Sequence, residues 1–232
     1  MQVGLYESAA SIQAYSRSLD TLSFNLSHTA TPRFKRRIST MEAFSMELQI
    51  AGNKVPIPTT RESVDFAPGA LIPTGNELDL AISGKGFYKI ETPEGIRYTR
   101  GGSFFQGPDG TIKNSQGERL LINGAVPKPG DPISINSSGE VSQANNPTGA
   151  KIPIYDFADY TQLVPEAGGR FNIDPSLEGP ATGTITPGFV EQSNMSSVDA
   201  LVGLVSLNRS FESSTRAMKT LDEIMQRTTT AV

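Results

Sequence analysis

The fold is decided at the N-terminus, where residues 5–26 read LYESAASIQAYSRSLDTLSFNL. Apolar and aromatic side chains recur there at steps of seven, with companions three residues on: Leu5, Ile12, Tyr15, Leu19, Leu22 and Leu26. A heptad repeat puts these side chains on one narrow stripe of an α-helix, which another helix must cover. We predict a helix from about residue 3 to about residue 30, because Pro32 disfavours helical geometry in the preceding residue.

A second heptad stripe lies near the C-terminus. Its members are Leu204, Leu207, Phe211, Met218, Leu221 and Met225. Ser196, followed three residues later by Asp199, resembles a capping box that opens this helix, which we expect to run to about residue 227. Glu212 and Arg216 form a supporting pair four residues apart. The two stripes can cover each other within one chain or pair with neighbouring copies, and the sequence leaves both arrangements open.

Between the helices the sequence predicts an antiparallel β-rich region. Strand-like runs at 87–91 and 96–100 flank Thr92-Pro93-Glu94-Gly95, a four-residue turn. Turns are also expected at 107–110 and 114–117, and residues 138–141 weakly repeat 109–112. The predicted fold class is therefore α+β. Its domains are residues 1–40 (N-terminal helix and basic turn), 41–75 (extended, proline-containing connector), 76–190 (β-rich centre) and 191–232 (C-terminal helix).

Composition restricts the chemistry available to this chain. The net charge of −4 provides no global basic field for nucleic acid or an anionic membrane. There is no cysteine, which excludes disulfides and thiolate chemistry. His28, the single histidine, falls inside the helical pattern without a nucleophile or metal-ligand partner nearby. We therefore expect no metal, no cofactor and no enzyme activity.

Two motifs could be mistaken for functional sites. Gly84-Lys85-Gly86 resembles part of a phosphate loop but lacks the third glycine and the following helix, so a hairpin or bulge explains it better. Asp156 and Asp159 could form a carboxylate pair, yet no other polar group converges on them in sequence. An enzyme hypothesis would be revived by activity lost on mutating either aspartate.

The sequence shows neither the apolar run of a cleaved secretory signal nor the roughly 20 apolar residues of a spanning helix. These patterns favour the cytoplasm. They also leave open export by machinery that does not read such a signal.

Four blocks in order resemble the bacterial flagellar rod and hook axial proteins. They are Asn25-Leu26-Ser27-His28-Thr29-Ala30-Thr31-Pro32-Arg33-Phe34-Lys35-Arg36, then residues 75–87 (GNELDLAISGKGF), then residues 96–104 (IRYTRGGSF), and residues 188–195 (GFVEQSNM) leading to 208–212 (NRSFE). The motif residues are Asn25, Leu26, Thr31, Pro32, Phe34, Lys35, Asp79, Gly84, Gly86, Phe87, Tyr98, Thr99, Arg100, Glu191, Ser193, Asn194 and Arg209.

The resemblance implies a structural subunit of the flagellar basal-body rod that polymerises through its terminal helices, with the β-rich region outside them. The implied partners are other rod, hook and basal-body proteins, further copies of the chain and the type III export apparatus. It also implies a location in the basal body, reached across the periplasm without a cleaved signal. Chain length favours rod over hook, and the short connector favours the proximal rod protein over the distal one.

Arg33 departs from the family pattern, which usually has glycine at this position. A side chain makes left-handed backbone geometry costly, so we expect no left-handed turn there. A hypothesis from another class also stays open: a β-domain on a helical stalk that binds cell-wall glycan. That function would need an aromatic stacking platform, and the chain has no tryptophan and 6 tyrosines.

Overall fold

A computed structural model describes residues 2–50, 53–144 and 146–230, with side chains described over 8–41, 60–144 and 146–227. The chain forms two compact units. The terminal unit comprises residues 1–29, 36–65 and 195–232, and the β-domain comprises residues 30–35 and 66–194.

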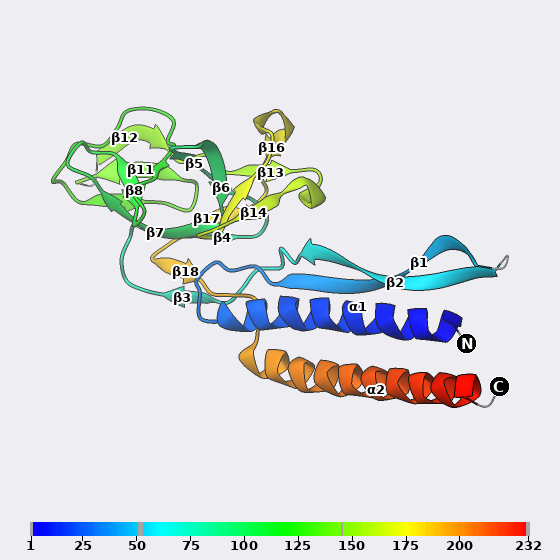
Figure 1. The fold of residues 1–232 in the computed structure, drawn as a ribbon. Helices are drawn as coiled ribbons and strands as arrows, with labels where there is room; N and C mark the ends of the chain where they lie inside the picture. The colour runs from blue at the N-terminus through cyan, green and yellow to red at the C-terminus, as the bar shows by residue number, and fades with distance from the viewer. Residues whose placement is uncertain (1, 51–52, 145, 231–232) are drawn as a thin grey trace. The chain divides into compact units, whose positions relative to one another are not determined.

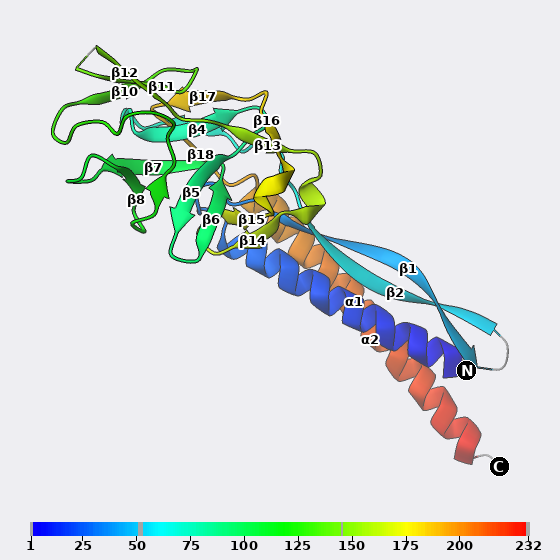
Figure 2. The same cartoon turned by 90° about the horizontal axis from the view of Figure 1, so that it is seen from above.

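The terminal unit contains the two long helices and one β-hairpin. Helix α1 (Gln2–Ser27) lies between helix α2 (Ser197–Thr230) on one side and the hairpin of β1 (Arg37–Ile50) and β2 (Asn53–Val64) on the other (Figures 1 and 2). The hairpin is antiparallel, with Arg37 opposite Val64 and Phe44 opposite Ile57. Residues 41–75, which were expected to form an extended connector, therefore contain most of the β1–β2 hairpin. Extended backbone was expected there, but its pairing was not.

Both helices begin and end close to their predicted positions. Helix α1 stops three residues before Ala30, and the N–H of His28 donates to the carbonyl of Asn25 in the turn that follows. Ser196 caps α2: its Oγ accepts a hydrogen bond from the N–H of Asp199 at 3.3 Å. The predicted pair of Glu212 and Arg216 is also present, with charged atoms 3.6 Å apart.

The β-domain is built from short antiparallel strands, which confirms the α+β class. Its main sheet has the order β14-β15-β6-β5-β9-β8-β7-β4-β17. These strands are β4 (Asp79–Ser83), β5 (Tyr88–Thr92), β6 (Gly95–Thr99), β7 (Gly101–Gln106), β8 (Ile112–Asn114), β9 (Arg119–Leu120), β14 (Val164–Glu166), β15 (Arg170–Asn172) and β17 (Thr184–Pro187). The hairpin predicted around residues 92–95 joins β5 to β6.

Three smaller sheets complete the β-domain. One has the order β10-β11-β12, and β13 pairs with β16 and β18 with β3. Their bounds are β3 (Leu71–Pro73), β10 (Ile133–Ile135), β11 (Glu140–Gln143), β12 (Asn146–Lys151), β13 (Tyr155–Phe157), β16 (Glu178–Pro180) and β18 (Phe189–Glu191). Single 3₁₀ turns occur at Tyr160–Gln162 and Pro175–Leu177.

Two apolar clusters form the core of the β-domain. The larger is mainly aliphatic and includes Leu80, Ile82, Ile90, Ile112, Leu120, Val141 and Ile185. The smaller is aromatic: Phe87 packs edge-on against Phe66, Tyr160 and Phe171, with ring centroids 5.7–6.0 Å apart. Because these rings pack edge to face against one another inside the domain, they do not form a platform for a sugar ring.

One turn occurs twice in the β-domain with the same hydrogen bonds. In NSQGE (114–118) and NSSGE (136–140), the first asparagine accepts from two backbone N–H groups and donates to the glutamate that ends the motif. The glycines, Gly117 and Gly139, have φ of 81° and 82°, in the left-handed region that glycine adopts without steric cost. The turn at 107–111 is closed by the same two backbone hydrogen bonds, with Gly110 at φ 80°, so the expected likeness of 109–112 to 138–141 is also present in the structure.

Candidate functional site

The two predicted heptad stripes meet within one chain. The described members on α1 (Ile12, Tyr15, Leu19, Leu22, Leu26) and on α2 (Leu204, Leu207, Phe211, Met218, Leu221, Met225) are all half-buried. The side chain of Leu5 lies outside the described residues. A Cβ on Gly203 of α2 would lie 3.0 Å from Cδ2 of Leu22, so the helices approach closely at this point. The seam between the two helices is thus formed, and its side chains remain partly exposed.

Helix α1 has a second buried stripe that sequence reasoning missed. Ala14, Ser18, Thr21 and Asn25 are at most 6% exposed and face the hairpin. The Oγ1 of Thr21 donates to Glu62 at 2.9 Å, and the amide of Asn25 both donates to the carbonyl of Arg37 (2.7 Å) and accepts from its N–H (2.8 Å). The sequence does contain polar residues at helical spacing on this face of α1. They could not be recognised as contacts to a hairpin, because the hairpin itself was not predicted.

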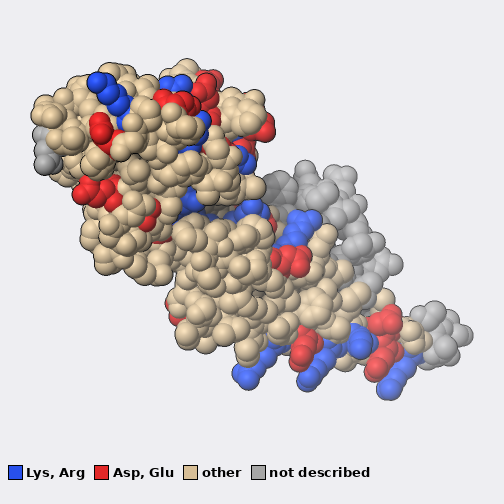
Figure 3. All heavy atoms as spheres, turned by 90° about the vertical axis from the view of Figure 1, so that its left-hand side faces the viewer, with Lys and Arg blue, Asp and Glu red and all other residues tan. Residues whose placement is uncertain are grey.

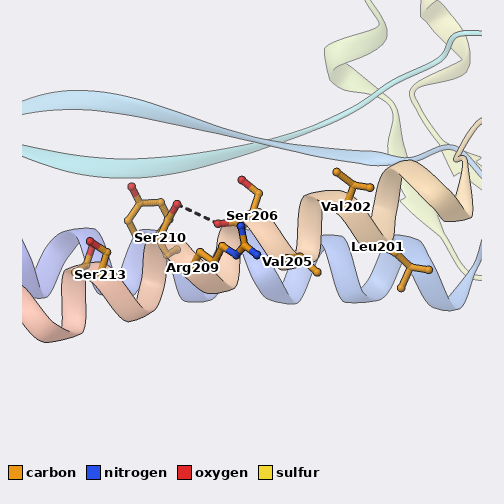
Figure 4. A pocket seen from close by; sticks show the side chains of 9 residues that line it. Leu201, Val202, Val205, Ser206, Arg209, Ser210 and Ser213 are labelled. Carbon is orange, nitrogen blue, oxygen red and sulfur yellow. Dashed lines mark hydrogen bonds between the residues drawn. The ribbon is translucent and has the colours of Figure 1, made fainter.

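The outer face of α2 carries uncovered apolar side chains. Val198, Leu201, Val202 and Val205 are 53–66% exposed, whereas Ala200 is the one buried residue among the described side chains of this helix. A shallow groove of about 720 Å³ runs along this face (Figure 4). Its lining includes Tyr15 of α1, the three residues Leu201, Val202 and Val205, and the motif residue Arg209.

In the β-domain, two basic motif residues converge on the buried carboxylate of a third. The Nζ of Lys35 donates to Oε1 of Glu191 at 2.6 Å, and the Nε of Arg100 lies 3.4 Å from Oε2. These three side chains are at most 3% exposed. The N–H of Gly69 donates to Oε1 at 2.8 Å. Glu191 therefore ties together segments that enter and leave the β-domain at different points along the chain.

Arg100 also binds the glycine motif of the β4–β5 connection. Its Nη1 donates to the carbonyl of Gly86 at 3.1 Å, and its Nη2 donates to the carbonyl of Gly84 at 2.9 Å. A Cβ on Gly86 would lie 2.3 Å from Cγ2 of Ile154, so no side chain fits there. Gly84-Lys85-Gly86 is therefore a packed bend whose carbonyls are held by arginine, as its sequence context suggested.

The other motif residues stabilise local structure. Asn194 donates through Nδ2 to the carbonyl of Ala67 at 3.0 Å, and its N–H donates to the carbonyl of Phe34. The buried Asp79 accepts from Asn76 at 3.1 Å. Phe87 and Tyr98 belong to the aromatic cluster, and Thr99 donates to the carbonyl of Gly101 at 3.1 Å. Thr31, Pro32 and Ser193 occupy the segments beside this network, with the carbonyl of Thr31 accepting from the N–H of Phe34.

Arg33 overturns the expectation about its backbone. Its φ is 65°, so the left-handed turn is kept although the side chain is not glycine. The Nη1 of Arg33 donates to the carbonyl of Gly101 at 2.6 Å, and its backbone N–H donates to the carbonyl of Glu191 at 2.8 Å. These hydrogen bonds offset the steric cost of placing a side chain in the left-handed region. Burial lowers the pKa of the guanidinium, and the negative charge of Glu118 opposes that shift.

The candidate carboxylate pair has local roles. Asp156 accepts from the hydroxyl of Tyr160 at 2.6 Å, and Asp159 caps a 3₁₀ turn by accepting from the N–H of Thr161 at 2.9 Å. The ring of His28 packs against Phe24, with centroids 4.7 Å apart. Within the described residues, no three carboxylates or histidines gather where a metal could bind. No helix in the described part of the chain is long and apolar enough to cross a bilayer.

The chain is similar in sequence to known flagellar proteins. Residues 81–143 match the flagellar hook protein FlgE/F/G D1 domain, and residues 186–231 match the flagellar basal body rod FlgEFG protein C-terminal region. The chain is 26% identical to the flagellar basal-body rod protein FlgG of Bacillus subtilis over 254 residues, covering 96% of each chain.

Relatives named FlgF are equally similar. The chain is 28% identical to the flagellar basal-body rod protein FlgF of Mesorhizobium japonicum over 237 residues (94% of this chain and 93% of the relative). It is 27% identical to FlgF of Caulobacter vibrioides over 235 residues (97% and 95%). Together with the paired terminal helices and the β-rich centre, these matches show that the chain is similar to the structural proteins of the flagellar basal-body rod FlgE/F/G family.

Proposed function

We propose that this chain is a subunit of the proximal rod and that it polymerises with neighbouring subunits through α1 and α2. The observation that carries this proposal is the poor coverage of α2, a helix of 34 residues in which Ala200 is the one buried residue among the described side chains. Most helices in proteins owe their stability to packing of an apolar face. An assembly that adds further helices around this layer supplies that packing.

The preference for proximal over distal rod rests on length. The alignment to the FlgG of Bacillus subtilis spans 254 positions, whereas alignments to two FlgF proteins span 235 and 237. This chain has 232 residues, so its alignment to the FlgF proteins contains fewer gaps than its alignment to FlgG. FlgF is the name of the proximal rod protein.

Further partners follow from the same proposal. They are the other rod, hook and basal-body proteins and the type III export apparatus, which would carry the chain across the periplasm without a cleaved signal. The alternative within the family is the distal rod. The two differ in a measurable way, because a subunit of the proximal rod is added before the distal rod grows.

A deletion experiment in the source bacterium tests this order. Basal bodies isolated after deletion of the gene for the FlgG-like rod protein should still contain this chain. If the chain disappears from those basal bodies while it remains in the wild type, it belongs to the distal rod instead.

Substitutions in the seam test the role of the helices. Leu19→Asp or Phe211→Asp places a charge between α1 and α2 and should abolish incorporation into basal bodies, while the β-domain stays folded by circular dichroism. Asn208→Asp, at an exposed position of α2, is the matched control and should incorporate normally. Motile cells with normal flagella carrying either seam variant would contradict the proposal.

A further inference from the structure

A reactive pair of residues, Asn123 and Gly124, lies on the surface of the β-domain. It is the one asparagine–glycine pair in the sequence, and both residues are exposed. Glycine carries no Cβ, so nothing shields its backbone nitrogen from the side chain of the residue before it. Asn123 can therefore close a ring between its side-chain amide and the following backbone nitrogen more readily than any other asparagine of the chain.

The fold itself requires glycine at position 124. The φ angle of Gly124 is 105°, in the region that glycine adopts without steric cost. A Cβ on Gly124 would lie 2.7 Å from the carbonyl oxygen of Gly149 and 3.0 Å from the Cα of Ala150. Both are backbone atoms, which cannot rotate away as the end of a side chain can. Packing against residues 149–150 therefore keeps the reactive pair in the chain.

The side-chain amide of Asn123 is free to react. Among the residues that the structure describes, neither this amide nor the N–H of Gly124 makes a hydrogen bond. Asn136 provides the contrast, because it is also exposed but its amide donates to Glu140 at 2.8 Å and accepts from the N–H of Ser138 at 3.0 Å. We therefore expect the amide of Asn136 to be held in place while that of Asn123 is not.

A backbone bridge opposes ring closure in the folded chain. The N–H of Asn123 donates to the carbonyl of Lys151, and the N–H of Lys151 donates to the carbonyl of Asn123, both at 2.7 Å. Ring closure must rotate the backbone between Asn123 and Gly124 until the nitrogen reaches Cγ, and this rotation swings the carbonyl of Asn123 away from Lys151. The two hydrogen bonds must therefore open first, in a local opening of the native structure.

We propose that Asn123 is a site of self-modification, in which the backbone nitrogen of Gly124 attacks Cγ of Asn123 when the bridge to Lys151 opens. The nitrogen loses its proton and bonds to Cγ, the Cγ–Nδ2 bond breaks, and Nδ2 leaves as ammonia with that proton. Water then adds to one carbonyl carbon of the resulting succinimide and breaks the bond from that carbon to the nitrogen. Attack of water at Cγ gives aspartate, and attack at the backbone carbonyl gives isoaspartate. Water is the only co-reactant.

The modification changes both the charge and the backbone of the β-domain. Each event replaces a neutral amide by a carboxylate in a chain of net charge −4, and neutral residues (tan) make up most of the face that Figure 3 shows. The isoaspartate product also lengthens the backbone by a carbon atom, so the two hydrogen bonds to Lys151 and the close packing against Gly149 cannot both re-form. This loosening goes beyond the proposed function and does not depend on it.

Incubation of the purified chain at mildly alkaline pH tests the site. Ion-exchange chromatography separates the more acidic product, and mass spectrometry of peptides locates it. Asn123 should convert before every other asparagine, with Asn136 as the internal comparison. Because two hydrogen bonds of ordinary strength must open in the folded chain, conversion in guanidinium chloride should be about five- to a hundredfold faster. Asn123→Gln, whose amide would need a larger ring, is the control and should give no such product.

Two substitutions at Lys151 test the role of the bridge. Lys151→Pro removes the N–H that donates to Asn123, since proline has none, whereas Lys151→Ala keeps it. The N–H and the carbonyl of Lys151 both bond Asn123, so the proline takes no hydrogen bond from the pairing with Glu140. Loss of one hydrogen bond should speed conversion about two- to tenfold in K151P, while K151A should match the wild type. Circular dichroism checks that both variants are folded.

Hydrogen exchange supplies a measure that needs no variant. The N–H of Lys151 exchanges when the bridge opens, so its slowing relative to an unfolded chain should match the slowing of Asn123 conversion. Conversion of another asparagine first, or none at Asn123 within about a hundred half-lives of the unfolded chain, overturns the site. Equal rates in folded K151P and K151A, or a large mismatch between exchange and conversion, overturns the role of the bridge.

Discussion

Glu191 accepts a hydrogen bond from Lys35 at 2.6 Å, although the two residues are 156 positions apart in the chain. Both side chains are at most 1% exposed. The same carboxylate accepts from the N–H of Gly69 and lies beside Arg100, so three distant segments meet at one buried charge. Such a group stabilises the β-domain only while every partner is present.

Because Lys35 and Glu191 form a buried ion pair, a small substitution at Glu191 should strongly lower the free energy of unfolding. Glu191→Gln keeps the shape of the side chain but leaves the ammonium of Lys35 buried without its counter-charge. We expect a loss of about 3–5 kcal/mol in the free energy of unfolding, as is typical when one partner of a buried pair is removed. Urea unfolding followed by tyrosine fluorescence measures it. Glu212→Gln, which breaks an exposed pair with Arg216, is the control and should change stability by less than about 1 kcal/mol.

A double substitution checks the cause. Replacing both partners together (Lys35→Met with Glu191→Leu) removes the uncompensated charge and should recover part of the loss. If the double variant is less stable than Glu191→Gln by itself, the hydrogen bonds to the carboxylate matter more than its charge, and the electrostatic explanation is wrong.

Two substitutions at Arg33 should separate the contribution of the backbone conformation to stability from that of the side chain. Arg33→Ala and Arg33→Gly both remove the bond from the guanidinium to the carbonyl of Gly101, but only glycine relieves the left-handed backbone at φ 65°. We therefore expect the glycine variant to be more stable than the alanine variant by about 1 kcal/mol. Equal stabilities by urea unfolding would show that the backbone at this position is not strained.

The sequence predicts the helices well because their signals are local. The heptad stripes, the cap at Ser196 and the hairpin at residues 92–95 each depend on neighbouring residues, and all three are present in the structure. The pairing of β1 with β2 was not predicted, because Pro56 and Pro58 suggest a connector. Proline is nevertheless tolerated in a strand at the edge of a sheet.

Other features depend on contacts that the sequence does not encode locally. Lys35, Arg100 and Glu191 were identified by resemblance alone, and their meeting at one carboxylate becomes visible only in the folded β-domain. The polar stripe through Ser18, Thr21 and Asn25 had no meaning without the hairpin that it contacts. At Arg33, the rule that a left-handed backbone favours glycine did not hold, because tertiary hydrogen bonds of the arginine offset the steric cost of its side chain.

Alkaline pH should unfold the β-domain through its tyrosines. Burial raises the pKa of Tyr88, and burial together with a carboxylate partner raises the pKa of Tyr98 and Tyr160. The unfolded chain loses these protons near pH 10.0, the ordinary pKa of tyrosine, while the folded chain retains them. Their contribution to stability is therefore complete below that pH and is lost as the pH rises above it.

Absorbance at 295 nm during an alkaline titration measures this effect. Tyr88, Tyr98 and Tyr160 should ionise only in the same transition in which the far-ultraviolet circular dichroism of the β-domain is lost. Tyr160→Phe removes one ionising group, so the transition should move to higher pH and involve one tyrosine fewer. Ionisation of all tyrosines before any loss of structure would contradict this explanation.

The repeated turn offers a comparison in which burial is the main variable. Asn114 and Asn136 make the same three hydrogen bonds, but Asn114 is 7% exposed and its partner Glu118 also binds Arg170, whereas Asn136 is exposed. Asn114→Ala leaves the N–H of the buried Glu118 without its side-chain acceptor and should cost about 2–3 kcal/mol. Asn136→Ala should cost about 1 kcal/mol or less, because water replaces the lost acceptor. Equal losses in urea unfolding would show that turn geometry, rather than burial, sets the stability of this motif.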